Sequence, residues 1–367
     1  MIIPSSIAIT ILTVLIFILY SKTKKIKADK FLMAFLLTIA LGVLNDVLWE
    51  LFQEQNHLFR FGSVSVPLAA AFLYLYATSL TSIRKPSTLR KIIVFTPSIL
   101  VLATNYFVAE IELVNRGSTI QISAYYFVKI ALAATIVALA SYELYGYSKR
   151  IKRCFSDIEK IDFRWLKFLV NSSLILVCCI PIGFVILKIW SLDSIETFSL
   201  VANSFVFAFV LILAFYGIKN TNAFKDVITE EKINDVINDE DGNTNTNIKS
   251  FDINEEQVET LTNFVEKEKP FLEERITISQ LSQQVDIPQR QLSAIINSRF
   301  KMNFFDYINS YRINEFNQRV SNGDTKNFTI LAIAFDCGFS SKSAFNRAYK
   351  KHVGVPPSEF VQSGTTA

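Results

Sequence analysis

Histidine and cysteine are scarce in this chain, and neither is spaced for metal or redox chemistry. Among 367 residues there are two histidines, His57 and His352, in different halves of the chain. The four cysteines are Cys154, Cys178, Cys179 and Cys337. No spacing among them resembles a zinc site or a disulfide framework. We therefore expect reduced structural cysteines, no metal site and no cofactor.

The sequence also lacks the local motifs of common enzymes. It has only eleven glycines, and none of them forms a phosphate-binding loop or a nucleophile elbow. With two isolated histidines and no cluster of metal-ligating residues, an enzyme is not expected.

Polar residues are unevenly distributed along the chain. Residues 1–220 are strongly apolar and residues from 221 onward are polar and charged, so the mean hydropathy of +0.32 averages two unlike halves. The net charge of +4 is too small to indicate nucleic-acid binding by itself. We expect three parts: a multi-pass transmembrane region (1–220), an acidic, Asn-rich linker (221–254) and a soluble domain (255–367).

The apolar half contains seven segments of nearly spanning length. A helix of roughly 20 apolar residues crosses a bilayer core. The segments are approximately Ile2–Tyr20, Phe31–Phe52, Phe61–Ser82, Ile92–Ala109, Ile122–Tyr147, Trp165–Trp190 and Phe198–Gly217. The sequence therefore predicts about seven transmembrane helices.

Basic residues in the loops predict the orientation of these helices. The loops after the first, third and fifth segments hold five, four and six Lys or Arg, whereas the alternate loops hold only Arg60 and Arg116. Because basic loops stay in the cytoplasm during insertion, we expect the N-terminus outside a bacterial inner membrane and the C-terminal half inside.

Six polar residues lie at outer depths of the predicted spans, where burial in lipid is costly. They are Asn45, Asp46, Glu50, Asn105, Lys129 and Asn203. Asp46 and Glu50 are four residues apart and share one helix face. One hypothesis is an outward-facing polar sensor cavity, with Asp46 or Glu50 paired to Lys129, that receives a small ligand or a proton. The alternative is an ion pair that only fixes the helix bundle.

From Val258 onward, two stretches repeat the plan of helix, tight turn and second helix. In the first, Ile278–Val285 is expected to be a helix, Pro288 suits the first turn of the next helix, and that helix runs to about Phe300. A long helix, about Phe304–Val320, should follow.

The second stretch has clearer capping signals. Thr329 is the expected N-cap of Ile330–Phe335, Gly338 provides the turn, and Ser340 or Ser341 caps a helix that buries Phe345 and Tyr349.

At these residues the chain resembles the AraC family of transcriptional regulators. Asp306-Tyr307-Ile308-Asn309 with Arg312-Ile313 is similar to the family's linker helix. The pattern from Ile330 through Gly338-Phe339-Ser340-Ser341 and Phe345-Asn346-Arg347 to Gly354 and Pro356 resembles its signature. The likeness spans about Gln257–Gln362. Two departures are Ser282, where members often have Ala, and Lys301–Asn303, where they often have Gly.

The resemblance implies a seven-helix domain whose two recognition helices enter successive major grooves of double-stranded DNA. The implied base-reading positions are Arg290, Ser293, Ala294, Lys342, Ser343 and Arg347. The full set of expected DNA-contacting residues that face outward is Arg290, Gln291, Ser293, Asn297, Lys342, Ser343, Asn346, Arg347 and Lys350. Arg can pair with guanine, and Asn and Gln with adenine. Arg299, Lys301, Lys350 and Lys351 suit phosphates.

The sequence thus predicts an all-α, membrane-bound, sequence-specific transcriptional regulator that senses a signal through its transmembrane helices. Its expected partners are double-stranded DNA, the lipid bilayer, RNA polymerase, a second copy in a homodimer and an unidentified small ligand. Two alternatives remain: a transporter-like membrane domain with an accessory DNA-binding module, and a membrane domain that only anchors the regulator.

Overall fold

The computed structural model describes residues 2–21, 27–52, 62–81, 87–114, 119–158, 164–189, 204–212 and 254–364. These residues form two compact units. The first contains Met1–Gly146 and Phe163–Val227, and the second contains Tyr147–Asp162 and Ile228–Ala367. The expected domain boundaries place 147–162 with the membrane region, whereas the contacts group these residues with the C-terminal half.

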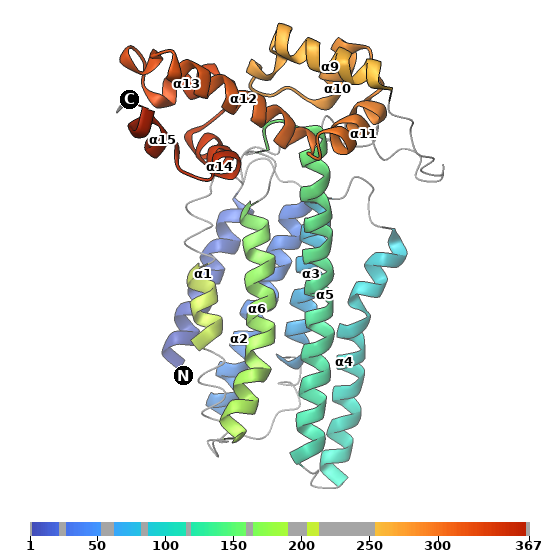
Figure 1. The fold of residues 1–367 in the computed structure, drawn as a ribbon. Coiled ribbons are helices and arrows are strands. Elements are labelled where there is room, and N and C mark those ends of the chain that lie inside the picture. The colour runs from blue at the N-terminus through green and yellow to red at the C-terminus, as the bar shows by residue number, and fades with distance from the viewer. Residues whose placement is uncertain are drawn as a thin grey trace. The chain divides into compact units, whose positions relative to one another are not determined.

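The first unit is a bundle of long helices (Figure 1). Its elements are α1 (Ile2–Tyr20), α2 (Lys27–Phe52), α3 (Gly62–Thr81), α4 (Thr88–Val114), most of α5 (Thr119–Cys154), α6 (Arg164–Ile189) and a helical stretch at 204–212. The first six match the first six predicted segments, and α2, α4 and α5 extend beyond them by a few residues.

Helix α3 is central to the first unit, where it contacts α2, α4 and α6. Small side chains make this possible: Ala71 and Ala77 are fully buried, and they allow neighbouring helices to approach closely. An Ala-rich helix face of this kind is typical of helix packing in membranes.

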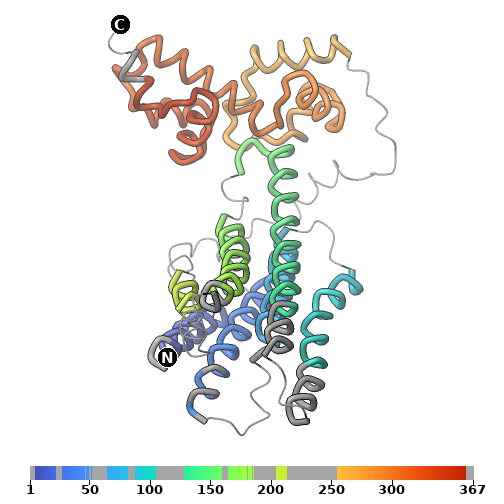
Figure 2. Tube along the Cα trace, turned by 60° about the horizontal axis from the view of Figure 1, so that its bottom comes forward, coloured from blue at the N-terminus to red at the C-terminus, as the bar shows by residue number. Residues whose placement is uncertain are grey.

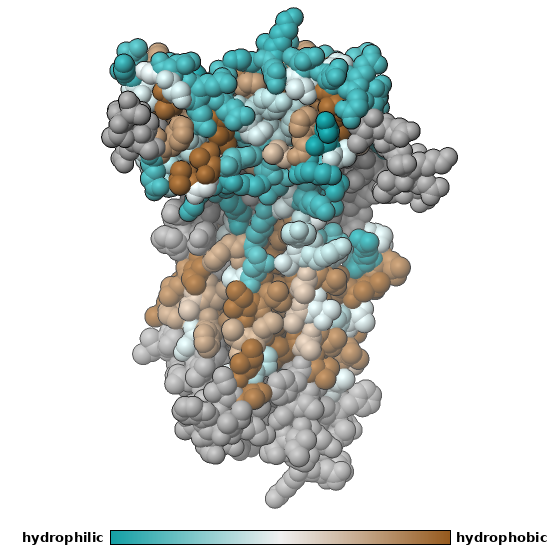
Figure 3. Space-filling model, viewed as in Figure 1, coloured by the Kyte–Doolittle hydropathy of each residue, from teal (hydrophilic) through white to brown (hydrophobic). Residues whose placement is uncertain are grey.

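The outer surface of the first unit is apolar. Phe17 on α1 is 67% exposed, Leu89 on α4 is 67% exposed and Ile175 on α6 is 63% exposed. In Figure 3 hydrophobic side chains predominate over the coloured part of this unit, and hydrophilic ones predominate over the second unit. Soluble proteins rarely expose so much contiguous apolar surface.

The prediction of seven spanning helices is not met within the described ranges. Four helical stretches are both long and apolar enough to cross a membrane: Lys27–Asn45, Val64–Thr81, Val128–Cys154 and Arg164–Gly183. The apolar part of α1, Ser5–Tyr20, is shorter. Helix α4 does not qualify, and most of the seventh segment, including its ends, lies outside the described residues. Within the described residues, four and not seven of the predicted spans are therefore long and apolar enough to cross a membrane.

The second unit contains seven α-helices within residues 254–364, as the family resemblance implied. They are α9 (Glu255–Glu268), α10 (Ile278–Val285), α11 (Gln289–Arg299), α12 (Phe304–Ser321), α13 (Ile330–Asp336), α14 (Lys342–Val353) and α15 (Pro357–Gly364). Short 3-10 helices η3 (Pro270–Leu272) and η4 (Asp324–Lys326) lie between them. Figure 2 shows α9–α11 and α13–α15 as two groups joined by α12.

Each group has its own apolar centre, and α12 contributes to both. In the second group Phe316 of α12 packs against Phe345 and Tyr349 of α14, with ring centroids 4.7 and 5.6 Å away. In the first group Tyr307 of α12 lies 4.9 Å from the ring of Phe300. A single long helix therefore shares its aromatic side chains between the two motifs.

Candidate DNA-binding surface

The first helix-turn-helix motif is formed by α10 and α11. Thr277 and Gln280 form a capping box that starts α10, and Asp286 ends it in the left-handed conformation at φ 55°. The hydroxyl of Ser282 donates to the carbonyl oxygen of Ile287 at 2.6 Å and holds the turn. An alanine at this position could not make this bond.

Helix α11 presents most, but not all, of its expected residues to solvent. Arg290 and Asn297 are exposed, whereas Gln291 is half-buried and its Nε2 donates to Oε1 of Gln257 at 2.6 Å. Ser293 was expected to face outward, and this was wrong, because its side chain is only 8% exposed. Its carbonyl oxygen accepts a hydrogen bond of 2.8 Å from Asn297 Nδ2. The prediction that Leu292, Ile295 and Ile296 are buried is confirmed.

The turn after α11 explains the second departure from the family pattern. Lys301 has a positive φ of 55°, in the region that glycine adopts most easily. Asn303 then caps α12 by accepting a hydrogen bond from the backbone of Asp306. Lys301 thus adopts the backbone conformation for which related sequences often use glycine.

The second motif, α13 and α14, follows the expectations closely. Thr329 caps α13, Ser341 caps α14, and Phe345 and Tyr349 are buried. All expected DNA-contacting residues of this helix are exposed. They are Lys342, Ser343, Asn346, Arg347 and Lys350.

Gly338 holds the two motifs close together. It has a φ of +91°, and a Cβ added to it would lie 2.5 Å from the carbonyl oxygen of Phe271 and 3.0 Å from Arg312 Nε. Phe271 belongs to η3, immediately before the first motif. Only glycine fits at this position, both for its backbone conformation and for the space available.

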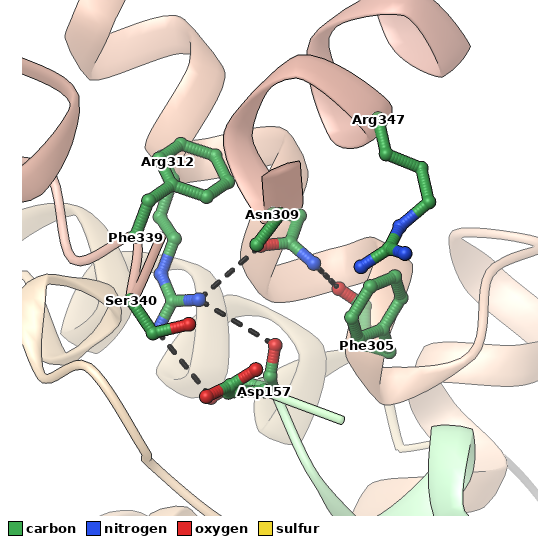
Figure 4. A pocket seen from close by; sticks show the side chains of 9 residues that line it. Asp157, Phe305, Asn309, Arg312, Phe339, Ser340 and Arg347 are labelled. Atoms are coloured by element: carbon green, nitrogen blue, oxygen red, sulfur yellow. Dashed lines mark hydrogen bonds between the residues drawn. The ribbon is translucent and has the colours of Figure 1, made fainter. Parts of the chain in front are cut away.

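Arg312 is the polar centre of the junction between the motifs (Figure 4). The residue is 1% exposed, and its guanidinium donates to the carbonyl oxygens of Phe271 and Glu273 at 2.7 Å. It also lies 5.7 Å from the ring of Phe339, in the second motif. Burial lowers the pKa of Arg312 to about 10, although nearby carboxylates, Asp157 first among them, oppose this shift.

A segment that sequence reasoning had missed reaches the same junction. The main-chain oxygen and hydroxyl of Ser156, which follows α5, both accept hydrogen bonds from Arg312, at 3.5 and 3.3 Å. The residues that line the small cavity there are Ser156, Asp157, Phe305, Asn309, Arg312, Phe339, Ser340, Ala344 and Arg347. Nothing in the local sequence around Ser156 predicts this contact.

One expected phosphate-binding residue has an internal partner. Lys351 Nζ lies 2.6 Å from Asp306 Oδ2, so the end of α14 is tied to the start of α12. The neighbouring His352 has a pKa lowered by burial, an effect that Asp306 partly opposes. Lys351 therefore supports the junction, although its side chain is also exposed, and Lys350 is the exposed lysine left to contact DNA.

The structure describes only part of the expected intramembrane site. Asn45 on α2 is half-buried, and Lys129 on α5 is 6% exposed. The side chains of Asp46, Glu50 and Asn105 and the whole of Asn203 lie outside the described residues, so the pairing of Lys129 with Asp46 or Glu50 stays a prediction. Among the described residues, no group of His, Cys, Asp and Glu could hold a metal ion.

Comparison with known protein families identifies a match for one part of the chain. Residues 281–363 match the family described as a helix-turn-helix domain, of the AraC type. No curated protein and no solved structure matches the chain. The match covers most of α10 and extends through α11, α12, α13 and α14 into α15, so it contains both motifs and the helix that joins them. It supports an AraC-family regulator that binds DNA and controls transcription.

Proposed function

We propose that this chain is a membrane-bound transcriptional regulator that reads a specific DNA sequence with α11 and α14. The observation that carries the proposal is the pair of helix-turn-helix motifs joined by α12, each presenting a second helix with exposed polar and basic side chains. Two such helices on one rigid junction can enter successive major grooves, as the family resemblance implies.

Arg347 and Arg290 are the proposed base readers, because an exposed arginine on a recognition helix can donate two hydrogen bonds to guanine. Asn297 and Asn346 add donors and acceptors on the same helices, and Lys350 is a phosphate contact. Phe271–Phe360 contains eleven Lys and Arg and eight Asp and Glu, a net charge of +3. Because this net charge is modest, we expect tight binding to require a homodimer or tandem sites on the DNA. At those sites the bound protein would regulate RNA polymerase.

Sequence-specific binding can be tested with duplexes that the full-length protein enriches from a random-sequence pool. Arg347→Ala should weaken binding to the enriched duplex by about 1–3 kcal/mol and affect a scrambled duplex much less. Lys326→Ala is the matched control, because it removes an exposed positive charge from η4, outside both recognition helices. Equal losses on both duplexes would contradict base reading by Arg347.

The membrane location is supported by the four long apolar helices, the exposed apolar side chains of the first unit and the alternation of basic loops. The protein should remain with the membrane fraction after washing with high salt and with alkaline carbonate. A reporter fused after Gln362 should be cytoplasmic. Release by carbonate, or a periplasmic reporter, would contradict this part of the proposal.

We further propose that the first unit senses a signal, since a single helix would be enough for anchoring. Lys129, buried on α5, is the charged residue of the proposed sensor whose side chain the structure describes. Lys129→Met should abolish signal-dependent changes in promoter occupancy while the basal occupancy persists. Uptake of solutes by vesicles that contain the protein would instead favour the transporter-like alternative, and full regulation without the first unit would favour simple anchoring.

A further inference from the structure

The segment that follows α5 is an integral part of the DNA-binding unit. We call residues Phe155–Ile158 the strap. The backbone N–H of Ser156 donates to the carbonyl oxygen of Ile276 at 3.2 Å, and Phe155 forms an antiparallel bridge with Thr277. With the two bonds from Arg312, the strap is attached both to the start of the first motif and to α12.

The burial of the strap indicates a defined docking site. Ser156 is 1% exposed and Ile158 is 4% exposed, and Ile151 and Cys154 at the end of α5 are fully buried. A polar side chain with that little exposure is stable only when it has hydrogen-bond partners, and Arg312 supplies them for Ser156. The contact therefore depends on specific partners and does not result from chance proximity.

The docked strap lies beside the helix face that is proposed to read DNA. Ser156 and Asp157 line the same cavity as Ala344 and Arg347, which are one turn apart and share one face of α14 (Figure 4). In Figure 1 the strap lies below α12, with α14 to one side and α11 to the other. DNA in contact with Arg347 would have to approach Asp157, whose negative charge repels phosphates.

The strap is also coupled directly to a long helix. Helix α5 ends at Cys154 and the strap begins at the next residue, so no flexible linker separates them. The same helix carries Lys129 of the proposed sensor. A rotation or axial shift of α5 would therefore act on Ser156 and Asp157, and through Arg312 on the junction between the motifs.

We propose that the strap is an autoinhibitory element, which restricts access of DNA to Arg347 while docked and is withdrawn when α5 moves. This inference rests on the proposed DNA-binding function. If the strap is docked in about nine molecules of ten, the apparent affinity for DNA is roughly tenfold below that of the released form.

The test uses the full-length protein in detergent micelles with its four cysteines replaced by alanine. Asp157→Cys and Ala344→Cys are introduced together, and a short bis-methanethiosulfonate reagent joins the two thiols reversibly. The probe is a duplex that the uncross-linked double variant enriches from a random-sequence pool. We expect the cross-linked protein to bind this duplex at least about tenfold more weakly than the same sample after dithiothreitol has cleaved the cross-link and the strap is again free to undock.

A second pair of variants requires no cross-link. Asp157→Asn should strengthen binding about threefold by weakening both docking and the repulsion of phosphates. Glu259→Gln on α9 removes the same charge from an exposed position and should change binding less. Equal effects of the two variants would overturn a specific role for Asp157.

The remaining outcomes separate the two proposals. Absence of any cross-link would overturn the docked geometry. Equal or tighter binding by the cross-linked protein would overturn autoinhibition and leave the DNA-binding function intact. Absence of DNA binding in every form, including Asp157→Asn, would overturn the proposed function and the autoinhibition with it.

Discussion

Arg312 Nε donates a hydrogen bond of 2.7 Å to the carbonyl oxygen of Phe271, 41 residues earlier in the chain. Since Arg312 lies on α12 and Phe271 lies on η3, this bond fixes the linker helix against the entrance to the first motif. The same guanidinium contacts the ring of Phe339 in the second motif. One buried side chain therefore contributes to the relative position of the two motifs from both sides.

Replacing the buried Arg312 should destabilise the second unit more than replacing an exposed arginine. Arg312→Ala leaves the carbonyl groups of Phe271 and Glu273 without their donor and creates a cavity, so we expect a loss of about 3–5 kcal/mol. Hydrogen exchange of peptides from 254–364 would measure this loss locally. Arg275→Ala is the control, because that side chain is 55% exposed and its loss should cost less than about 0.5 kcal/mol.

Gly338→Ala should also separate the motifs, for a steric reason. The new Cβ would lie 2.5 Å from the Phe271 carbonyl oxygen, in addition to the cost of a φ of +91°. Gly323→Ala is a matched control with a φ of +87° and no atom nearer than 3.9 Å. The control should cost about 1–2 kcal/mol from conformation alone, and Gly338→Ala should cost clearly more in the same hydrogen-exchange measurement. Equal costs would contradict the close approach.

The stability of the second unit should fall as the pH drops below about 6.5. Burial lowers the pKa of His352 in the folded state, and its Nε2 has no hydrogen-bond partner. Because the unfolded chain then binds a proton more readily than the folded chain, stability is complete above the unfolded value of 6.5 and is lost as the pH falls toward the folded pKa. Thermal unfolding between pH 5 and pH 8 would reveal the slope. His352→Gln should reduce the dependence of the unfolding temperature on pH. If that dependence is unchanged in the variant, another titratable group is responsible for it.

The adjacent lysines of α14 should differ in their effects on DNA binding. Lys350 is exposed, so we expect Lys350→Ala to remove one phosphate contact. The slope of log K against log salt concentration should then fall by about 1, and binding to all duplexes should weaken similarly. Lys351 is paired with Asp306 at 2.6 Å, so Lys351→Ala should instead lower the stability of the junction. Titrations at several salt concentrations, combined with unfolding curves, would distinguish the two. A larger change in salt slope for Lys351→Ala than for Lys350→Ala would contradict this division of roles.

Two residues of α11 should likewise differ in their effects on DNA binding. Arg290 is exposed, and Arg290→Ala should cost about 1–3 kcal/mol at the enriched duplex. Ser293 is only 8% exposed, so Ser293→Ala should change DNA affinity by less than about 0.5 kcal/mol. Fluorescence anisotropy with the enriched duplex would measure both. A large loss for Ser293→Ala would restore it as a direct base contact.

Much of the second unit was predictable because its signals are local. Thr329, Gly338 and Ser341 determine helix starts and a turn through their own backbone and side-chain preferences, and each performs the predicted role. The buried positions of α14 follow from helical periodicity, which also places Arg347 outside. The exposure of Ser293 was mispredicted, because periodicity alone does not reveal the side of α11 on which neighbouring elements pack.

The sequence by itself determined the helices, their caps, the two motifs and the polar faces of α11 and α14, since these depend on residues within a few positions of one another. Tertiary structure alone decided that Ser156 meets Arg312, 156 residues away, and that Asp157 shares a cavity with Arg347. No local pattern encodes such contacts. They exist because the folded chain brings the N–H donors of the buried Arg312 guanidinium next to the carbonyl and hydroxyl oxygens of Ser156.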